Sequence, residues 1–208
     1  LSIEIYPMSR EEYKTVFQAG IDGVTLYQET YDRQLYAKYH PAGPKRDYDM
    51  RLDSPERFAA AGMRRIGLGA LLGLADWRLE TLALGEHAAY LMKKYWQGQV
   101  SFSFPRLRPA FRVGDDWPHL LSDGDLVQMM LALRLCFADA GIVLSTRERS
   151  RLRDHLIELG VTRMSAGSKT NPGGYPARRQ TGEQFEVADH RSPAEIAEMI
   201  RSRGRQAV

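Results

Sequence analysis

A regular alternation of short apolar strands and amphipathic helices runs through most of the chain, and it constrains the fold more than any other feature. Six segments have the pattern of short strands, and each of the first five leads through a helix or partly helical connection to the next. The predicted strands are 2–6, 22–26, 65–72, 100–104, 142–145 and 161–166. Alternation of this kind predicts a parallel sheet with right-handed crossovers. Two architectures fit it, an open doubly wound sheet and a (β/α)8 barrel.

The strand count limits the choice between these two architectures. No G-x-G-x-x-G motif follows the first strand, so the dinucleotide-binding fingerprint of many doubly wound sheets is missing. A complete barrel needs eight strands and typically about 250 residues, whereas this sequence has 208 residues. We therefore expect either an incomplete barrel or an open sheet. The expected organisation is one barrel domain over residues 1–176 and a C-terminal tail over 177–208, with a terminal helix that begins at Ser192.

Helix signals between the strands define the expected core. Ser9 followed by Glu12 predicts a capping box at the first helix. Asp76 opens a long helix, whose expected apolar face consists of Leu79, Leu82, Ala83, Tyr90 and Leu91. The helix that begins at Ser122 has an apolar stripe of Leu126, Met129, Met130, Leu133 and Phe137. We expect Cys136 to be a small buried residue of this helix, and we expect 147–154, which mixes both charge signs, to be a solvated helix start.

Composition excludes several classes of protein. The single cysteine, Cys136, cannot form a disulfide within the chain or build a cysteine-ligated cluster, and it favours the reducing cytoplasm. The five histidines have no metal-ligand spacing to one another. The formal net charge of +3 is too small to argue for nucleic acid. No apolar run approaches the roughly 18 residues of a membrane helix.

Arginine, serine, glutamate and glycine follow the predicted strands at their carboxyl ends, where α/β folds bind ligands. Arg106, Arg108 and Arg147 suit a carboxylate or phosphate, because a guanidinium can bind either in bidentate fashion. The alternative is that they form structural bridges with Glu29 and Glu148. From spacing alone the two interpretations are about equally supported.

The other candidates also have two interpretations each. Glu29 suits the hydroxyl groups of a ribose, or it neutralises an arginine. Gly67 and Gly69 allow close approach of a ligand or of a neighbouring strand. Ser165 and Ser168 suit an anion, or they hydrogen-bond within their own loop.

Five motifs at these strand ends, in this order, resemble a known family. They are YQETY, IGLGALLGL, SFSFPRLRPA, LSTRE and SAGSKTNPGGY. The sequence resembles the radical S-adenosylmethionine tyrosine lyases, the family of the 2-iminoacetate synthases of thiamine thiazole biosynthesis. The resemblance runs from the first residues to about Tyr175 and more loosely through the tail. The related tyrosine lyase of hydrogenase maturation shares much of the pattern.

The resemblance implies a (β/α)8 TIM-type barrel that uses S-adenosylmethionine and a [4Fe–4S] cluster. In this family a C-x3-C-x2-C loop after the first strand holds the cluster, and that loop is absent here. The sequence is similar to the C-terminal two-thirds of the family, so the six strands correspond to the third to eighth of the barrel. We expect the segment alone to be inactive. We also expect the unpaired barrel edges to be covered by upstream residues or by oligomerisation.

The implied reaction is radical cleavage of the tyrosine Cα–Cβ bond to dehydroglycine and p-cresol. The resemblance implies an electron donor and a thiazole synthase as protein partners. Two alternatives to the lyases named above stay open. The first is a radical enzyme of the same subgroup that acts on another amino acid, and the second is a cluster-free α/β module that binds an anion or a protein.

The motifs also imply residue roles. Glu29 matches the ribose contact, with Gln28 and Tyr31 beside it. The adenine is expected against the backbone of Ile66, Gly67 and Gly69. Arg147 matches the group that binds the tyrosine carboxylate, assisted by Ser165 and Ser168. Arg106 and Arg108 are further candidates at the cofactor or in the layer behind it.

Overall fold

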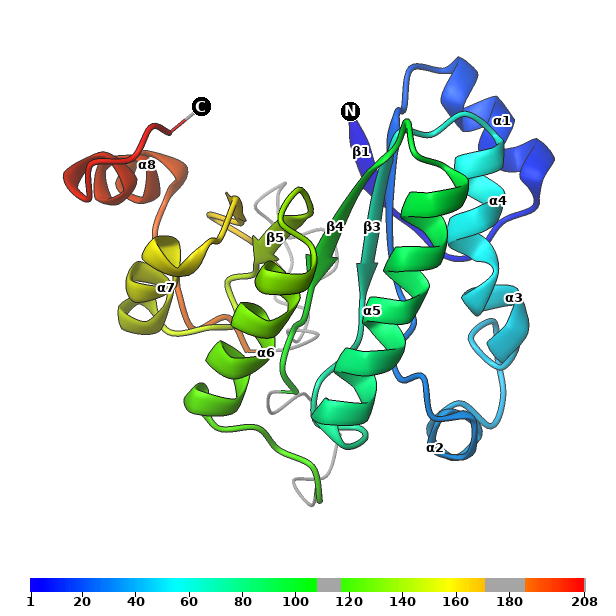
Figure 1. The fold of residues 1–208 in the computed structure, drawn as a ribbon, viewed down its shortest axis with the longest axis horizontal. Coiled ribbons are helices and arrows are strands. Elements are labelled where there is room, and N and C mark those ends of the chain that lie inside the picture. Colours follow the sequence, from blue (N-terminus) through cyan, green and yellow to red (C-terminus); the bar gives the residue numbers. More distant parts are fainter. Residues whose placement is uncertain (108–116, 171–185, 208) are drawn as a thin grey trace, which may run out of the picture.

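The computed structural model describes residues 1–107, 117–170 and 186–207, and its six strands form one parallel sheet (Figure 1). The strands are β1 (Ser2–Glu4), β2 (Gly23–Tyr27), β3 (Arg65–Gly69), β4 (Gln99–Ser103), β5 (Gly141–Leu144) and β6 (Arg163–Met164). Their order in the sheet is their order in the chain. A doubly wound sheet would reverse its strand order at a switch point, so the sheet is a partial (β/α) barrel. All six predicted strands are confirmed.

Figure 1 shows α4, α5 and α6 side by side across one face of this sheet, with α2 beyond the strand ends and α8 away from the sheet. The helices are α1 (Arg10–Gln18), α2 (Arg33–Tyr39), α3 (Tyr48–Leu52), α4 (Ser54–Ala60), α5 (Trp77–Lys94), α6 (Asp123–Cys136), α7 (Ser150–Leu156) and α8 (Pro193–Ser202), with a 3-10 turn η1 (Ile157–Leu159) after α7. The capping box of Ser9 and Glu12 is confirmed, and Ser192 caps α8 in the same way. None of the helices in the described ranges is long and apolar enough to span a membrane.

The two faces of the sheet differ in chemistry, because successive side chains of a strand point to opposite faces. The helix-covered face holds the buried core residues Val24, Leu26, Ile66, Leu68, Val100, Phe102, Ile142 and Leu144. The opposite face, which we name the inner face, carries small and polar residues. On strands β1 to β4 these include Glu4, Thr25, Tyr27, Gly67, Gly69, Ser101 and Ser103. The core is therefore one-sided, and the inner face is the side on which a polar ligand could lie.

Gly67 and Gly69 keep the inner face closely packed. A Cβ atom added to Gly69 would lie 2.1 Å from the Ser103 carbonyl oxygen and 2.5 Å from the Tyr27 ring. One added to Gly67 would lie 2.3 Å from Thr25 Oγ1. The glycines thus let the side chains of β2 cross over β3, which is the strand-packing interpretation of their presence.

We expect Gly69→Ala to lower the free energy of unfolding by about 1–3 kcal/mol, because overpacking here meets a backbone carbonyl that cannot move aside. Chemical denaturation of the full polypeptide measures the change. Gly124→Ala in α6 is the matched control, since its Cβ meets nothing closer than Ser122 Oγ at 3.7 Å, and alanine favours a helix. Equal effects of the two substitutions would contradict the packing argument.

The expected apolar face of α5 is wrong for most of its residues. Leu79 and Leu82 are 65% and 66% exposed, and Tyr90 is also exposed. The buried residues are Glu80, Leu84, Ala88 and Leu91, of which only Leu91 was expected. The helix is rotated because the Glu80 carboxylate accepts hydrogen bonds from Thr30 Oγ1 and from the Tyr31 backbone N–H. A polar side chain therefore occupies a core-facing position that periodicity assigns to an apolar one.

The outcome for α6 is mixed. Leu126, Met129, Met130 and Leu133 are buried, which confirms the expected stripe. Cys136 is exposed, so the expectation of a buried cysteine is wrong. It follows the exposed Leu135 in the last turn of the helix, where both residues point away from the buried face formed by Met129, Met130 and Leu133.

Candidate functional site

The carboxyl ends of β1, β2 and β5 bring Glu4, Tyr27 and Arg147 to the inner face. Arg147 lies at this face because Val143 and Ser145 precede it at two-residue spacing on β5 and its extension. Its Nη1 donates to the Arg106 carbonyl oxygen at 3.4 Å. The Tyr27 hydroxyl lies 3.2 Å from Ser103 Oγ. A cation, a carboxylate and a phenol thus share one end of the inner face.

These groups influence each other's ionisation. Burial raises the pKa of Tyr27 to about 12, and the negative charge of Glu4 acts in the same direction, so the phenol stays protonated at neutral pH. Burial lowers the pKa of Arg147, opposed by Tyr27, Glu29 and Glu4. Partial desolvation of its carboxylate raises the pKa of Glu4, and the negative charge of Glu29 raises it further, although the residue as a whole is exposed. The positive charges of Arg147, Lys45 and Arg51 act on Glu4 in the opposite direction.

Beside these residues, a cavity of about 250 Å³ opens at the ends of β1 and β2, and Glu29 lies in its wall. Glu29 Oε1 accepts hydrogen bonds from Lys45 Nζ at 2.6 Å and Arg51 Nη2 at 2.9 Å. Arg51 is buried and donates its Nε to the Tyr27 carbonyl oxygen at 2.7 Å. Glu29 also has a backbone φ of 72°, which is unusual for a residue with a side chain. The turn and the two cations hold the carboxylate at the cavity wall.

Arg106 lies on the other side of the sheet, because it falls in the same alternation as Phe102 and Phe104. Its Nε donates to Glu148 Oε1 at 2.9 Å, and its Nη2 bonds both Glu148 Oε2 and Asp123 Oδ1. Its Nη1 donates to the Leu121 carbonyl oxygen at 3.2 Å. The structure thus places Arg106 in a buried bridge with Glu148, as the structural alternative expects. Arg108 lies outside the described residues.

Three further candidates also lie toward the helices. Ile66 is fully buried in the core, so only its backbone can face a ligand. The Tyr31 hydroxyl lies 3.0 Å from His87 Nδ1 on α5, and burial raises the pKa of this phenol. Gln28 is 4% exposed, and its Nε2 has no hydrogen-bond partner among the described residues. That amide is buried on the helix side and does not line the cavity that holds Glu29.

Ser165 extends the ladder beyond β6, since its N–H donates to the Leu144 carbonyl oxygen at 3.0 Å. By alternation with Arg163, its side chain belongs to the inner face next to the strand that carries Arg147. Ser168 is half-buried in the loop that follows. The structure therefore brings Arg147 and Ser165 to neighbouring strand ends, with Ser168 three residues further on.

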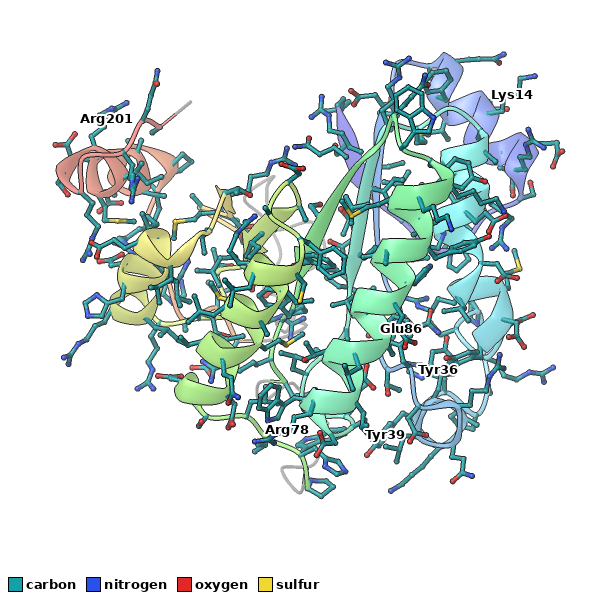
Figure 2. All side chains as sticks on the ribbon, viewed as in Figure 1. Lys14, Tyr36, Tyr39, Arg78, Glu86 and Arg201 are labelled. Atoms are coloured by element: carbon teal, nitrogen blue, oxygen red, sulfur yellow. The ribbon has the colours of Figure 1, made fainter. Side chains whose placement is uncertain are left out.

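Sequence reasoning missed Glu4, Tyr27, Lys45 and Arg51 as members of this site. Glu4 had a usable signal, because it stands between Ile3 and Ile5 in a strand and must face away from the core. Lys45 and Arg51 had none, since they reach Glu29 from the long polar connection that contains α2 and α3. Figure 2 shows Tyr36 and Tyr39 of α2 at the same end of the molecule as Arg78, at the start of α5.

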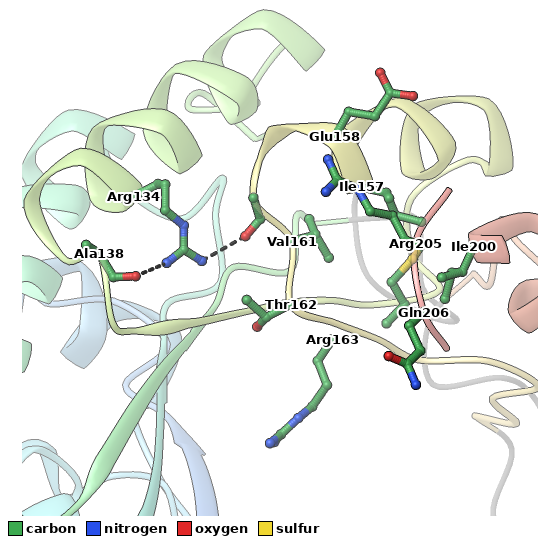
Figure 3. Close-up of a pocket in the computed structure, with 12 residues that line it drawn as sticks. Arg134, Ala138, Ile157, Glu158, Val161, Thr162, Arg163, Ile200, Arg205 and Gln206 are labelled. Atoms are coloured by element: carbon green, nitrogen blue, oxygen red, sulfur yellow. Dashed lines mark hydrogen bonds between the residues drawn. The ribbon is translucent and has the colours of Figure 1, made fainter. Parts of the chain in front are cut away.

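A larger cavity, of about 550 Å³, lies at the opposite end of the strands (Figure 3). It is lined by residues that precede β6 and by Ile200, Arg205 and Gln206 near the end of the described chain. Arg134, in its wall, donates to the carbonyl oxygens of Ala138 at 2.9 Å and Gly160 at 2.7 Å. These bonds tie the end of α6 to the turn before β6. Because parallel sheets bind ligands at the carboxyl ends of their strands, this cavity is a poor candidate for chemistry.

The described residues do not form a metal centre, since they contain no group of three or more His, Cys, Asp or Glu side chains placed to hold a metal ion. The only cysteine of the sequence, Cys136, is exposed on α6. The thiolate ligands of an iron–sulfur cluster are therefore not supplied by this chain.

Known proteins match the whole chain. It is 43% identical over 209 residues to the 2-iminoacetate synthase of Salmonella typhimurium and 42% identical to that of Escherichia coli K12, covering 100% of this chain and 55% of each relative. The chain thus spans about half the length of these relatives. A crystal structure titled HydG, a maturase of the [FeFe]-hydrogenase, superimposes with a TM-score of 0.91 and 40% identity over 98% of this chain and 44% of its own.

The structure of methylornithine synthase (PylB) shares the fold, with a TM-score of 0.72 at 18% identity over 100% of this chain and 59% of its own. The model of the Biotin and Thiamin Synthesis associated domain matches residues 103–206, which is half of the sequence and includes the strand ends that carry Arg147 and Ser165. The chain therefore belongs to the Biotin and Thiamin Synthesis associated domain family.

Proposed function

We propose that this chain is the larger part of the barrel of a 2-iminoacetate synthase, a radical S-adenosylmethionine lyase that cleaves tyrosine to dehydroglycine and p-cresol. The observation that carries the proposal is the 43% identity to a 2-iminoacetate synthase over all 208 residues of the chain. In the complete protein, two further strands and a cysteine loop would precede β1. Thiazole synthase and an electron donor are the proposed partners.

Arg147 is the proposed anchor for the tyrosine carboxylate. Its guanidinium lies at the inner face among anionic and neutral groups, where a second carboxylate can bind it in bidentate fashion. Ser165, at the adjacent strand end, would donate a further hydrogen bond to the same carboxylate, and Ser168 is a second candidate donor. Fixing the carboxylate at this point fixes the substrate Cα and side chain relative to the rest of the barrel, which is the orientation that a radical reaction requires.

One feature supports an S-adenosylmethionine site beside this anchor. The Glu29 carboxylate stands in the wall of the 250 Å³ cavity, which suits the hydroxyl groups of a ribose. When bound, the cofactor and its cluster supply the radical. The residues of this chain bind, orient and shield the substrate, and cluster ligands have to come from elsewhere.

The test is p-cresol formation from tyrosine by the full polypeptide after anaerobic reconstitution with iron and sulfide. We expect p-cresol that depends on S-adenosylmethionine and on a reductant, with no carbon monoxide. Carbon monoxide release would assign the protein to the hydrogenase-maturation branch, whose HydG relative superimposes with a TM-score of 0.91. Absence of p-cresol from a protein that holds its cluster would refute the lyase proposal.

A further inference from the structure

A buried ion pair joins α7 to the segment before α8. Arg153 and Asp189 have side-chain exposures of 0% and 1%. Arg153 Nη1 donates to the Asp189 carboxylate, and Arg153 Nη2 donates to the carbonyl oxygen of Ser165. Residues 147–154 were expected to be a solvated helix start, and for Arg153 and Glu148 that expectation is wrong, because both are buried. A charge this deep in the protein needs a reason, since burying an ion pair rarely adds stability.

The segment that carries Asp189, residues 186–191, also bonds two strand-end loops through its backbone, and we name it the strap. The N–H groups of Ala188 and Asp189 donate to the Thr146 carbonyl oxygen at 3.0 and 3.1 Å. The Gly167 N–H donates to the carbonyl oxygen of Arg191 at 3.1 Å. Thr146 immediately precedes Arg147, and Gly167 immediately precedes Ser168. The strap therefore holds together the two loops that carry the candidate carboxylate-binding residues.

The charge of Asp189 is secured inside the strap. Burial opposes its ionisation, but hydrogen bonds from the side chain and backbone of Arg191, together with the charge of Arg153, lower its pKa to about 2. Arg191 Nε lies 2.9 Å from Asp189 Oδ1, and Arg191 Nη2 reaches Asp154 Oδ1 at 2.8 Å. The Asp189 carboxylate is thus ionised at neutral pH.

We propose that Arg153 and Asp189 are positioning residues that set the geometry between Arg147 and Ser165 through the strap. The inference rests on the proposed function for the role of those two residues. Arg153 holds Ser165 by donating to the Ser165 carbonyl oxygen. Asp189 holds the loop of Arg147, because its N–H donates to the carbonyl oxygen of the preceding residue, Thr146. Arg153 lies on α7 and Asp189 in the strap, and both contact the backbone at or beside the residues that they position. A shift of about 1 Å in such a support can cost on the order of 100-fold in rate.

The experiment uses the full polypeptide with Asp189→Asn and Arg153→Lys. Arg203→Ala is the matched control. Arg203 lies in the same C-terminal tail as Asp189, and the substitution removes its solvent-accessible ion pair with Glu158 of η1, which has an N–O distance of 2.8 Å. For Asp189→Asn we expect the KM for tyrosine to rise by roughly 10- to 100-fold. We also expect faster hydrogen exchange at the amides of Gly167, Ala188 and Asp189. Arg153→Lys keeps the charge but loses the fork that reaches both acceptors, so its effects should be smaller.

Unchanged KM and unchanged exchange in Asp189→Asn would overturn the proposal, and so would an equal loss in Arg203→Ala. A uniform fall in kcat with an unchanged KM would assign the pair to general stability and overturn the positioning role. If Asp189→Asn does not fold, Arg153→Lys decides by the same two readouts. If the wild type forms no p-cresol, the proposed function fails, and exchange at the three amides still tests the strap itself.

Discussion

Arg147→Met in the full enzyme is expected to lower kcat/KM for tyrosine by roughly 30- to 150-fold. Truncating one partner of a buried, hydrogen-bonded charge pair costs about 2–5 kcal/mol, and the half-buried position of Arg147 places it near the lower end of this range. Tenfold in affinity corresponds to about 1.4 kcal/mol. Steady-state release of p-cresol at several tyrosine concentrations measures the change.

Arg149→Met is the control for this prediction. Arg149 lies two residues further on, its side chain is 71% exposed, and it pairs with Asp123 at 3.6 Å. It should leave the kinetics unchanged, because exposed pairs contribute little. Arg147→Lys should recover only part of the loss, since an ammonium cannot bind a carboxylate in bidentate fashion. Wild-type kinetics in Arg147→Met would remove Arg147 from the site.

The second large effect concerns stability. Arg106→Met is expected to lower the free energy of unfolding by about 3–5 kcal/mol, because removing one partner of a buried ion pair leaves the other charge buried without a counter-charge. Glu148 is only 2% exposed, and both of its carboxylate oxygens accept from Arg106. Urea denaturation of the full polypeptide, followed by circular dichroism, measures the difference.

Arg33→Met supplies the comparison, since its pair with Asp49 is exposed on both sides and is worth no more than about 1 kcal/mol. The double variant Arg106→Met with Glu148→Leu should regain part of the stability, because it removes the buried charge as well as its partner. If Arg106 instead bound a ligand directly, Arg106→Met would keep its stability and lose ligand affinity.

Local patterns were sufficient for the strands and for the strand-end positions of some candidate residues. The six strands follow from apolar segments and cap residues, which act over a few positions, but these patterns left an open sheet and a barrel as alternatives, and the choice of the barrel came from the family resemblance. The positions of Arg147 and Ser165 could be predicted because strand ends can be located from the same patterns. The position of Arg106 was also accessible, because counting by twos from Phe102 puts it on the helix side with the core residues. The rule that ligands bind at the carboxyl ends of strands does not say to which face of the sheet a residue points, so by itself it could not place Arg106.

Other features depended on contacts between distant parts of the chain. The rotation of α5 depends on Glu80, which bonds backbone and side-chain groups that lie about fifty residues earlier. Arg153 finds its counter-charge 36 residues away, in a segment whose sequence contains no recognisable signal for it. Lys45 and Arg51 reach Glu29 through a connection without strong periodicity. In each case a charged residue is placed by a partner that no local pattern identifies.

The consecutive strand order has a consequence for how such a chain acquires its structure. Each strand from β2 to β6 pairs with the strand just before it, so no strand is inserted between two that are already formed. A chain emerging from the ribosome can therefore add one strand and its helix at a time to a growing edge, from the N-terminal side onward. The pairing of each new strand then closes over a single strand–helix unit, which limits the entropy of loop closure at each step.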